Sequence, residues 1–323
     1  MKRTSYFLLL LSVIILIPGC SNDSSGTPSD FTPSLTQTAK KINIPELNLK
    51  ISINEGRLVF ESQSAFDAAV KALEEYEKTN LGSKLRSALQ ADGYITPVTK
   101  QDFTFETSGF LSLYDDFTTA MNEAENYYDT EEGYKQFKEK HSALFFAEQP
   151  EDYSAYLPVS NKSVAKFLNA KGEVEIAGEV KDIRDITSYK QLIDNGLVTA
   201  ESELVNLRST VNRLDEVKCN DRKLWVIVST RPGTSLGVYE EVVVEVCFRK
   251  KGFLGIWYNY SSETTLGWAP PSTGQWPKSG YSSHDYIWPR GHGAAPFQGR
   301  MWVQFRGFGE ECGDTKYYFD VNK

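Results

Sequence analysis

The sequence predicts a mixed α+β protein, with an N-terminal helix-and-hairpin region followed by a C-terminal antiparallel β-sandwich or barrel. Apolar residues at helical spacing recur up to about residue 208, whereas short alternating segments punctuated by glycine and proline follow residue 216. All six tryptophans lie between Trp225 and Trp302, so the composition changes at the same place. We therefore expect an α+β domain over residues 42–215 and a tryptophan-rich all-β domain over residues 216–323.

Residues 1–19 have the features of a lipoprotein signal peptide. Lys2 and Arg3 precede an apolar run over residues 6–17, which is shorter than the roughly 20 residues that span a bilayer. Residues 17–20 (IPGC) resemble a bacterial lipobox, in which the cysteine thiol receives the lipid. We predict cleavage before Cys20 and its lipidation, palmitate included, because several acyl chains make a stable anchor. An ordinary cleaved signal peptide or a short buried helix is the alternative.

Residues 20–41 are predicted to form a lipidated tether. They are rich in Ser, Thr, Pro and Asp, and so bury too little apolar surface to offset the entropy of ordering. Neither Ser21 nor Asn22 is the aspartate that retains lipoproteins at the inner membrane of enteric bacteria. We therefore expect an outer-membrane lipoprotein, and leave open whether it faces the periplasm or the exterior.

The formal net charge of the chain is −8, and loss of Lys2 and Arg3 with the leader gives −8 − 2 = −10. An acidic chain without basic clusters argues against nucleic-acid partners and against anionic lipid headgroups. A hydrophobic content of 40% and an aromatic content of 13% are sufficient for substantial cores. The predicted contact with the membrane is therefore the lipid anchor alone.

The α+β region shows its elements in order. Residues 42–60 alternate around a turn at Asn54-Glu55-Gly56 and predict a β-hairpin, and a helix with Ser64 and Asp67 as its capping pair follows at once. A second helix is predicted over residues 110–128. Its apolar stripe consists of Phe110, Leu113, Phe117, Met121 and Ala124. The carboxylates at 115–116 and 123–125 are expected on the opposite, solvated face.

Thr130 is predicted to cap a third helix that carries Tyr134, Phe137 and His141. Residues 167–180 indicate a helix end, a turn and a short hairpin. Further helical turns are expected near residues 187–194 and 200–208.

The all-β region begins with a central strand, because residues 224–230 are apolar on both faces. The segment RPGTSLG joins it to a strand over residues 239–248, so these two are expected to pair as a hairpin. In the second strand Val242, Val244, Val246 and Phe248 share one face. Further strands are expected at 255–262, 300–308 and 316–321.

Three cysteines remain besides Cys20, namely Cys219, Cys247 and Cys312, so at most one internal disulfide can form. The expected hairpin register places Cys247 opposite a position near Arg222, about 10 Å along the strand from Cys219. We therefore favour a bond between Cys219 and Cys312 over one between Cys219 and Cys247, and no bond is an equal alternative. Without a CxxC spacing, a structural zinc site is not expected.

Three segments resemble known proteins: the lipobox, residues 56–73 (GRLVFESQSAFDAAVKAL) and residues 167–178 (FLNAKGEVEIAG). They look like parts of the uncharacterised surface lipoproteins of Bacteroidetes that bear domains of unknown function. The resemblance implies a cell-envelope address and a broad type of protein. It implies no activity, because those proteins offer none to transfer.

Residues 267–299 are the most unusual segment, because aromatic rings alternate there with glycine, proline and serine. Their length and punctuation predict a long loop, on which exposed rings can stack on sugar faces while His284, Asp285 and Arg290 bind hydroxyl groups. The predicted ligand-binding residues are Trp268, Trp276, Tyr281, Asp285, Tyr286, Trp288 and Arg290. The alternative is that these rings fill the open end of the β domain as core.

No segment carries a catalytic signature. A GxSxG nucleophile turn and a glycine-rich phosphate loop are both absent from the sequence, and His284, Asp285 and His292 lack the spacing of a metal site. A glycosidase carboxylate pair stays open, because its separation is a three-dimensional property. We therefore predict no catalytic residue, no cofactor and no metal.

The predicted function is that of a lipid-anchored, non-enzymatic envelope protein whose β domain binds an extracellular glycan or protein. A scaffold or adhesin subunit that binds only protein partners is the first alternative, and an envelope hydrolase is the second. A sugar platform requires two or three exposed, coplanar rings in residues 267–299. A scaffold requires a broad apolar patch or an unpaired strand edge, and a hydrolase a cleft with converging carboxylates or a histidine of perturbed pKa.

Overall fold

The computed structural model describes residues 40–91, 96–100, 102–103, 110–147, 149, 152–195, 197, 212–269, 274–281, 283–306 and 316–323. All of them belong to one compact unit, residues 39–323. The predicted leader, Cys20, almost the whole tether and the helical turn at 200–208 lie outside the described residues. No helix in the described part of the chain is both long and apolar enough to cross a membrane.

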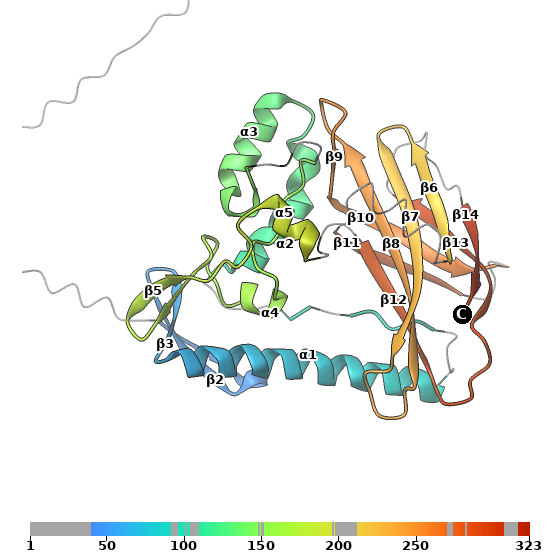
Figure 1. Cartoon of the computed structure of the whole chain (residues 1–323), viewed down its shortest axis with the longest axis horizontal. Coiled ribbons are helices and arrows are strands. Elements are labelled where there is room, and N and C mark those ends of the chain that lie inside the picture. The colour runs from blue at the N-terminus through green and yellow to red at the C-terminus, as the bar shows by residue number, and fades with distance from the viewer. Residues whose placement is uncertain are drawn as a thin grey trace, which may run out of the picture. The chain divides into compact units, whose positions relative to one another are not determined.

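Five strands form a mixed sheet in the order β1-β2-β3-β4-β5 (Figure 1). They are β1 (Lys40–Ile44), β2 (Leu49–Asn54), β3 (Arg57–Phe60), β4 (Glu173–Ile176) and β5 (Glu179–Asp182). The predicted hairpin is confirmed as β2 and β3, whose turn places Glu55 and Gly56 at positive φ as a two-residue loop requires. The hairpin predicted near residue 175 is confirmed as β4 and β5, and β4 pairs in parallel with β3.

The helices are α1 (Gln63–Ala91), α2 (Leu113–Glu123), α3 (Glu131–Lys140), α4 (Lys162–Ala165) and α5 (Tyr189–Asp194). Three 3₁₀ turns accompany them, η1 (Pro45–Leu47), η2 (Ala124–Asn126) and η3 (Ser142–Leu144). The cap of α1 differs from the prediction, because Ser62 rather than Ser64 accepts the first free N–H, from Ala65, at 3.2 Å. The Thr130 cap of α3 is confirmed, since its hydroxyl accepts from the Gly133 N–H at 3.0 Å.

Helix α1 contacts both the five-stranded sheet and the β-rich region, along whose lower edge it runs in Figure 1. Its 29 residues span about 44 Å. At its far end the Ser235 hydroxyl donates to the Gly82 carbonyl at 3.0 Å. A small apolar cluster joins it there to the outer face of a β sheet, formed by Leu85, Val98, Val238, Val243 and Ile287.

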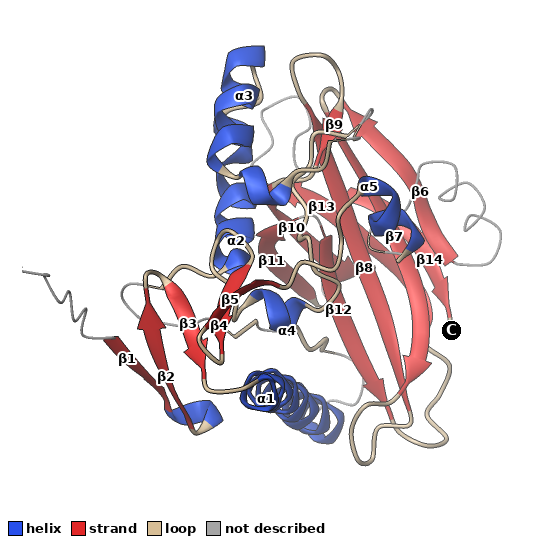
Figure 2. Ribbon diagram, turned by 60° about the vertical axis from the view of Figure 1, so that its left-hand side comes forward, coloured by secondary structure: helices blue, strands red, loops and turns tan. Residues whose placement is uncertain are grey.

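The β-rich region contains two antiparallel sheets, in the orders β11-β10-β13-β14 and β12-β8-β7-β6, with β9 added beside β8 (Figure 2). The second sheet is built from β6 (Asn212–Cys219), β7 (Arg222–Pro232), β8 (Glu240–Lys251), β9 (Trp257–Tyr258) and β12 (Ser283–Arg290). The first is built from β10 (Ser261–Trp268), β11 (Gln275–Tyr281), β13 (Gln298–Arg306) and β14 (Lys316–Asn322).

The mixed α+β class is confirmed, with one correction. The described strands form no closed barrel, because hydrogen-bonded pairing stops at β11, β12, β14 and β6. The described elements begin with strands, and the first long helix follows the hairpin. The predicted boundary at residues 215 and 216 falls inside β6, and the division into two domains stays a prediction.

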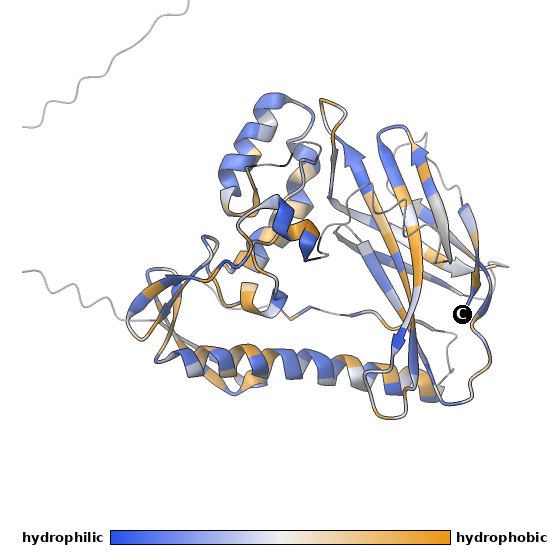
Figure 3. Cartoon of the chain, in the orientation of Figure 1, coloured by the Kyte–Doolittle hydropathy of each residue, from blue (hydrophilic) through white to orange (hydrophobic). Residues whose placement is uncertain are grey.

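Strand β8 carries the alternation that the sequence predicts. Val242, Val244, Val246 and Phe248 are all fully buried, and β7 lies between β8 and β6 as a central strand. Hydrophobic residues run along β7 and β8, whereas α3 is largely polar (Figure 3). The core therefore lies on the inner face of this sheet, as the sequence pattern indicates.

Residues 267–299 do not form one long loop, which corrects the prediction. They supply the end of β10, all of β11 and β12, and the start of β13. Pro277 in β11 and Pro289 in β12 made the segment look unsuited to strands. Both strands lie at a sheet edge, however, where a missing N–H is tolerated.

The β7–β8 hairpin is confirmed, but Cys247 faces Trp225 rather than a position near Arg222. Cys247 is a buried free thiol, whereas Cys219 is disulfide-bonded. Both the Cys219–Cys247 pairing and the alternative without a bond are therefore wrong. The partner of Cys219 lies outside the described residues, and its pairing with Cys312 stays a prediction.

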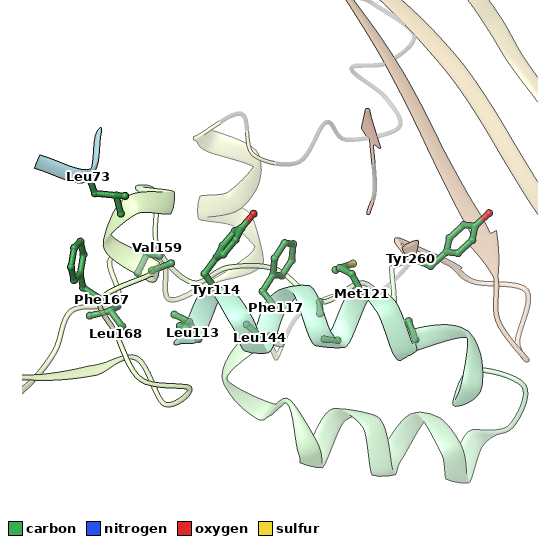
Figure 4. Packing of buried hydrophobic residues seen from close by; sticks show 14 of the residues in the cluster. Leu73, Leu113, Tyr114, Phe117, Met121, Leu144, Val159, Phe167, Leu168 and Tyr260 are labelled. Atoms are coloured by element: carbon green, nitrogen blue, oxygen red, sulfur yellow. The ribbon is translucent and has the colours of Figure 1, made fainter. Parts of the chain in front are cut away.

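The apolar stripe of α2 is confirmed, and Leu113, Phe117 and Met121 lie in the core (Figure 4). The carboxylates do not all lie on a solvated face, because Asp116 is only 8% exposed. Its Oδ1 is 2.7 Å from His141 Nδ1, and Glu123 Oε1 is 2.5 Å from Nε2 of the same ring. Helix α3 ends in this buried histidine, whose two nitrogens take both carboxylates as partners.

Candidate functional site

A cavity of about 520 Å³ lies between the helical region and the edge strands β11 and β12, within the same compact unit. Ligand sites are commonly clefts of this size between structural parts. The helical side contributes Asp102, Lys162 and the rings of Phe117 and Tyr156. The β side contributes Lys278, Tyr281, His284 and Asp285. Two aromatic rings thus face a set of groups that can form hydrogen bonds or ion pairs.

One wall of the cavity is a closed network around Asp102. The Lys162 ammonium lies 2.9 and 3.0 Å from its two carboxylate oxygens, and the Tyr114 hydroxyl donates to it at 2.6 Å. The hydroxyls of Tyr114 and Tyr281 also bond to each other. Helix α4 begins at Lys162, and its Asn161 cap fixes where that ammonium sits. This wall ties β11 to the helical region.

The charges of this wall neutralise each other. Burial raises the pKa of the Asp102 carboxyl, but the Lys162 charge and the Tyr114 hydrogen bond outweigh it and hold that pKa below its usual value. Burial also lowers the pKa of Lys162, and the attraction to Asp102 offsets this only in part. Burial raises the pKa of Tyr281, so its hydroxyl stays protonated.

The Tyr156 side of the cavity is held by Asp152, which is 4% exposed. Its carboxylate accepts hydrogen bonds from the Tyr156 hydroxyl and from the Ser154 N–H, the latter at 2.8 Å. The Ser154 hydroxyl in turn accepts from the Asn259 N–H at 2.8 Å, which anchors the segment to the β-rich region. The Tyr156 hydroxyl is therefore engaged, and its ring is the part left to contact a ligand.

Two cavity groups remain incompletely bonded. Lys278 donates to the main-chain oxygen of Asp285 at 3.3 Å, and no carboxylate of the described residues lies within ion-pair distance of it. Burial lowers its pKa. His284 is 1% exposed, its Nδ1 lies 2.7 Å from the Thr264 hydroxyl, and its Nε2 has no hydrogen-bond partner within the described chain. Burial and the nearby Lys278 charge lower the pKa of His284 to about 4, so the ring is neutral at neutral pH.

Beside the cavity, Asp285 on β12 faces Glu245 on β8 in the strand register. Burial raises the pKa of Glu245, and the Asp285 charge raises it further. Directly opposite residues in a sheet have Cβ atoms about 4.5–5.5 Å apart. The Glu245 carboxyl therefore holds a proton more readily than an exposed glutamate does, with a second carboxyl at close range.

The residues predicted from the sequence divide into three groups. Tyr281 and Asp285 line the cavity. Tyr286 and Trp288 are fully buried and belong to the core, and Arg290 at the end of β12 pairs with Glu240 at 2.5 Å. Trp276 packs edge-on against Trp288, and Trp268 packs against Phe297, both half-buried. The structure does not gather these rings on one exposed surface.

The sequence did not single out Lys278, Lys162 or Asp102. Asp102 precedes α2 in an irregular segment and Lys162 begins a single helical turn, so neither belongs to a periodic pattern. Lys278 and His284 offered a usable signal, because each lies near a proline that marks an edge strand. Polar residues close to such a proline therefore lie at the edge of a sheet.

A second cavity of about 470 Å³ adjoins α2 and the β4 strand. Most of its charged groups are engaged: Asp116 with His141, Lys140 with Glu123, Arg184 with Asp182, and Glu173 with Arg57. The first cavity is therefore the better candidate site. In the described part of the chain, no group of three His, Cys, Asp or Glu residues is placed to hold a metal ion.

No protein-family model matches the sequence, and no curated protein matches it. A crystal structure of a DUF4848 family protein from Bacteroides thetaiotaomicron is similar at a TM-score of 0.29 and 16% identity. The match covers 84% of this chain and 98% of that one. At this TM-score and identity the likeness assigns neither a fold nor an activity to this chain.

Proposed function

We propose that this protein is a lipid-anchored component of the cell envelope that binds an extracellular glycan in the cavity beside β11 and β12. The carrying observation is the composition of that cavity, which Phe117 and Tyr156 line together with Lys278, His284 and Asp285. Aromatic faces stack on the apolar C–H surfaces of sugars, and side chains that donate or accept bind their hydroxyls. The proposal moves the glycan site from the surface of residues 267–299 into the cavity that they border.

The test is a glycan-array screen of the mature protein from Ser21 onward, followed by titration of the glycans that bind. Asp285→Asn removes a cavity carboxylate without changing its size, and Asp194→Asn on the exposed α5 helix is the matched control. We expect the first substitution to weaken binding and the second to leave it unchanged. A protein that retains no glycan, or one that Asp285→Asn leaves unaffected, contradicts the cavity assignment.

The anchor is tested separately at Cys20. Its substitution Cys20→Ala should give an uncleaved or soluble product, because no thiol is left to receive the lipid. A variant that is processed and still partitions into detergent contradicts the anchor. In the wild-type protein, the same fractionation tests the outer-membrane location.

An envelope hydrolase is the second candidate, and the Glu245–Asp285 pair favours it. A carboxyl with a raised pKa close to a second carboxyl is the arrangement that acid–base hydrolysis of glycosides uses. Release of reducing ends from a bound oligosaccharide, lost in Glu245→Gln, supports this function. A glycan that binds and is recovered intact supports the binding protein.

A further inference from the structure

His284 presents a polar atom that the described chain leaves unused. Its ring is 1% exposed and packs edge-on against Phe248 at 5.1 Å between ring centres. Nε2 has no hydrogen-bond partner, and the Gly280 main chain beside it does not reach hydrogen-bond geometry. Buried polar atoms in folded proteins are nearly always hydrogen-bonded. Since His284 lines the cavity, the partner of Nε2 can come from a ligand.

A sugar hydroxyl can serve either tautomer of His284. Nδ1 lies 2.7 Å from the Thr264 hydroxyl, which can donate to the ring or accept from it. The neutral ring therefore carries its proton on Nδ1 or on Nε2. A sugar hydroxyl can accept from Nε2–H or donate to the Nε2 lone pair, so it satisfies this atom in both cases.

Lys278 supplies a positive charge nearby. One of its three N–H donors bonds to the main-chain oxygen of Asp285, and its charge has no carboxylate partner within ion-pair distance among the described residues. The other two lysines of the lining are paired, Lys162 with Asp102 and Lys100 with Glu77 at 3.7 Å. An anionic group is the ligand that the Lys278 ammonium favours.

We propose that the cavity selects an acidic sugar, whose carboxylate binds the Lys278 ammonium while a ring hydroxyl bonds to His284 Nε2. The inference rests on the proposed glycan binding and names its substrate class. The two anchors also fix the orientation of the sugar, because the ammonium attracts the carboxylate more strongly than the neutral imidazole does.

The test uses three disaccharides and isothermal titration of the mature protein from Ser21 onward. Digalacturonate carries the carboxylates, and its dimethyl ester keeps the shape without the charge. Galactobiose has neither the carboxylates nor the ester groups. We expect digalacturonate to bind about tenfold or more tightly than the ester, as a charge-assisted hydrogen bond implies. Lys278→Met should abolish that preference. Lys190→Met, an exposed lysine of α5, should keep it.

His284→Phe removes the polar Nε2 while keeping a ring of similar shape. We expect it to weaken the binding of all sugars by about tenfold, and to leave the preference for the carboxylate in place. His292→Phe, on the exposed turn after β12, is the matched control. If His284→Phe does not fold, Thr264→Val replaces it, because it removes the hydroxyl that holds Nδ1 and so should weaken the same sugars.

The outcomes separate the two proposals. Equal binding of digalacturonate and its ester, or a preference that survives in Lys278→Met, overturns the acidic-sugar assignment while glycan binding stands. If His284→Phe and Thr264→Val both leave sugar binding unchanged, the proposed bond between the sugar and His284 is overturned. A protein that binds none of the three sugars, nor any other on the array, overturns the proposed function as well.

Discussion

Two buried histidines of this protein, His284 and His141, have opposite electrostatic surroundings. Burial and the Lys278 charge lower the pKa of His284, and its Nε2 has no hydrogen-bond partner within the described chain. His141 contacts a carboxylate at each nitrogen, so its pKa rises despite burial. The first ring is therefore neutral at neutral pH with one unused nitrogen, whereas the second is a fully engaged structural group. Each difference leads to a measurable effect on stability.

Because Nε2 of His284 has no partner within the described chain, the unliganded protein should be no more stable than a variant with apolar side chains in place of Thr264 and His284. Replacing both members of a buried hydrogen-bonded pair by apolar groups of similar shape is nearly neutral or stabilising. We therefore expect Thr264→Val/His284→Phe to unfold in urea within about 1 kcal/mol of the wild type, or to be more stable. Thr264→Val alone should cost about 1–3 kcal/mol, because it leaves Nδ1 unbonded. A double variant less stable than the single one contradicts this account.

The contacts that His141 makes between α2 and α3 should make the stability of the protein depend on pH. Burial lowers its pKa, but hydrogen bonds to Asp116 and Glu123 outweigh burial and raise it above 6.5. A group whose pKa is raised by folding stabilises the folded protein at pH values below its pKa in the unfolded chain. That contribution is lost as the pH rises through the pKa of the folded state. Glu123 acts in reverse: burial raises its pKa, but Lys140 and His141 lower it below 4.5, so its contribution is lost as the pH falls.

We therefore expect His141→Gln to destabilise the protein by about 1–3 kcal/mol at pH 6 and by less at pH 9, measured by urea unfolding. The loss arises because the protonated ring binds two carboxylates and a neutral amide binds them less strongly. Exposed His292→Gln provides the control. A loss that grows with pH would show that the neutral ring, rather than the charged one, makes the stabilising contacts.

At the scale of elements, the periodic patterns in the sequence predicted which face of a strand or helix is buried, but not which distant segment packs against it. The alternation in β8 and the stripe of α2 matched burial, because one face of each packs on a core. The parallel pairing of β3 with β4 joins residues more than a hundred positions apart, and no local pattern records such a partner. Asp116 was placed in solvent because the sequence does not show that α3 returns to cover it. The cavity was missed for the same reason, since its walls meet only after packing.

Gly82 within α1 gives a prediction at this scale. A Cβ at this position would lie 2.8 Å from the Ser235 hydroxyl, which bonds to the Gly82 carbonyl. Alanine is favoured over glycine in a helix by about 1 kcal/mol, so in Gly82→Ala the gain and the clash oppose each other. Gly82→Ala/Ser235→Ala removes the clash and should be more stable than Gly82→Ala alone in thermal unfolding. Equal stability of the two would show that the turn carrying Ser235 moves aside freely.

At the scale of the whole molecule, α1 connects regions that differ in composition. It contacts β3 near its start and β12 near its end, and the Tyr114–Tyr281 contact adds a second connection through the cavity wall. The sequence predicted two domains because tryptophan content changes sharply near residue 217. Composition reports how each part fills its own core, whereas shared contacts decide whether the parts unfold together.

We expect residues 39–323 to unfold in one cooperative transition, followed by both tryptophan fluorescence and far-UV circular dichroism. Every tryptophan lies in the β-rich region and most of the helix lies outside it, so the two signals report different parts. Coincident transitions indicate a single unit. Two separate midpoints, or a stable fragment beginning near residue 212 after limited proteolysis, would instead support the two predicted domains.

Strands β11 and β12 follow each other directly, yet each belongs to a different sheet. The chain passes from one sheet to the other across residue 282, so the neighbouring side chains Lys278, Ser279, Ser283 and Asp285 border the cavity without filling the core. Substitutions at these four positions should change the lining of the cavity while both sheets keep their packing. This short stretch therefore gives the fold evolvability: a lineage, or a designed library, can alter the chemistry of the cavity there at little cost in stability.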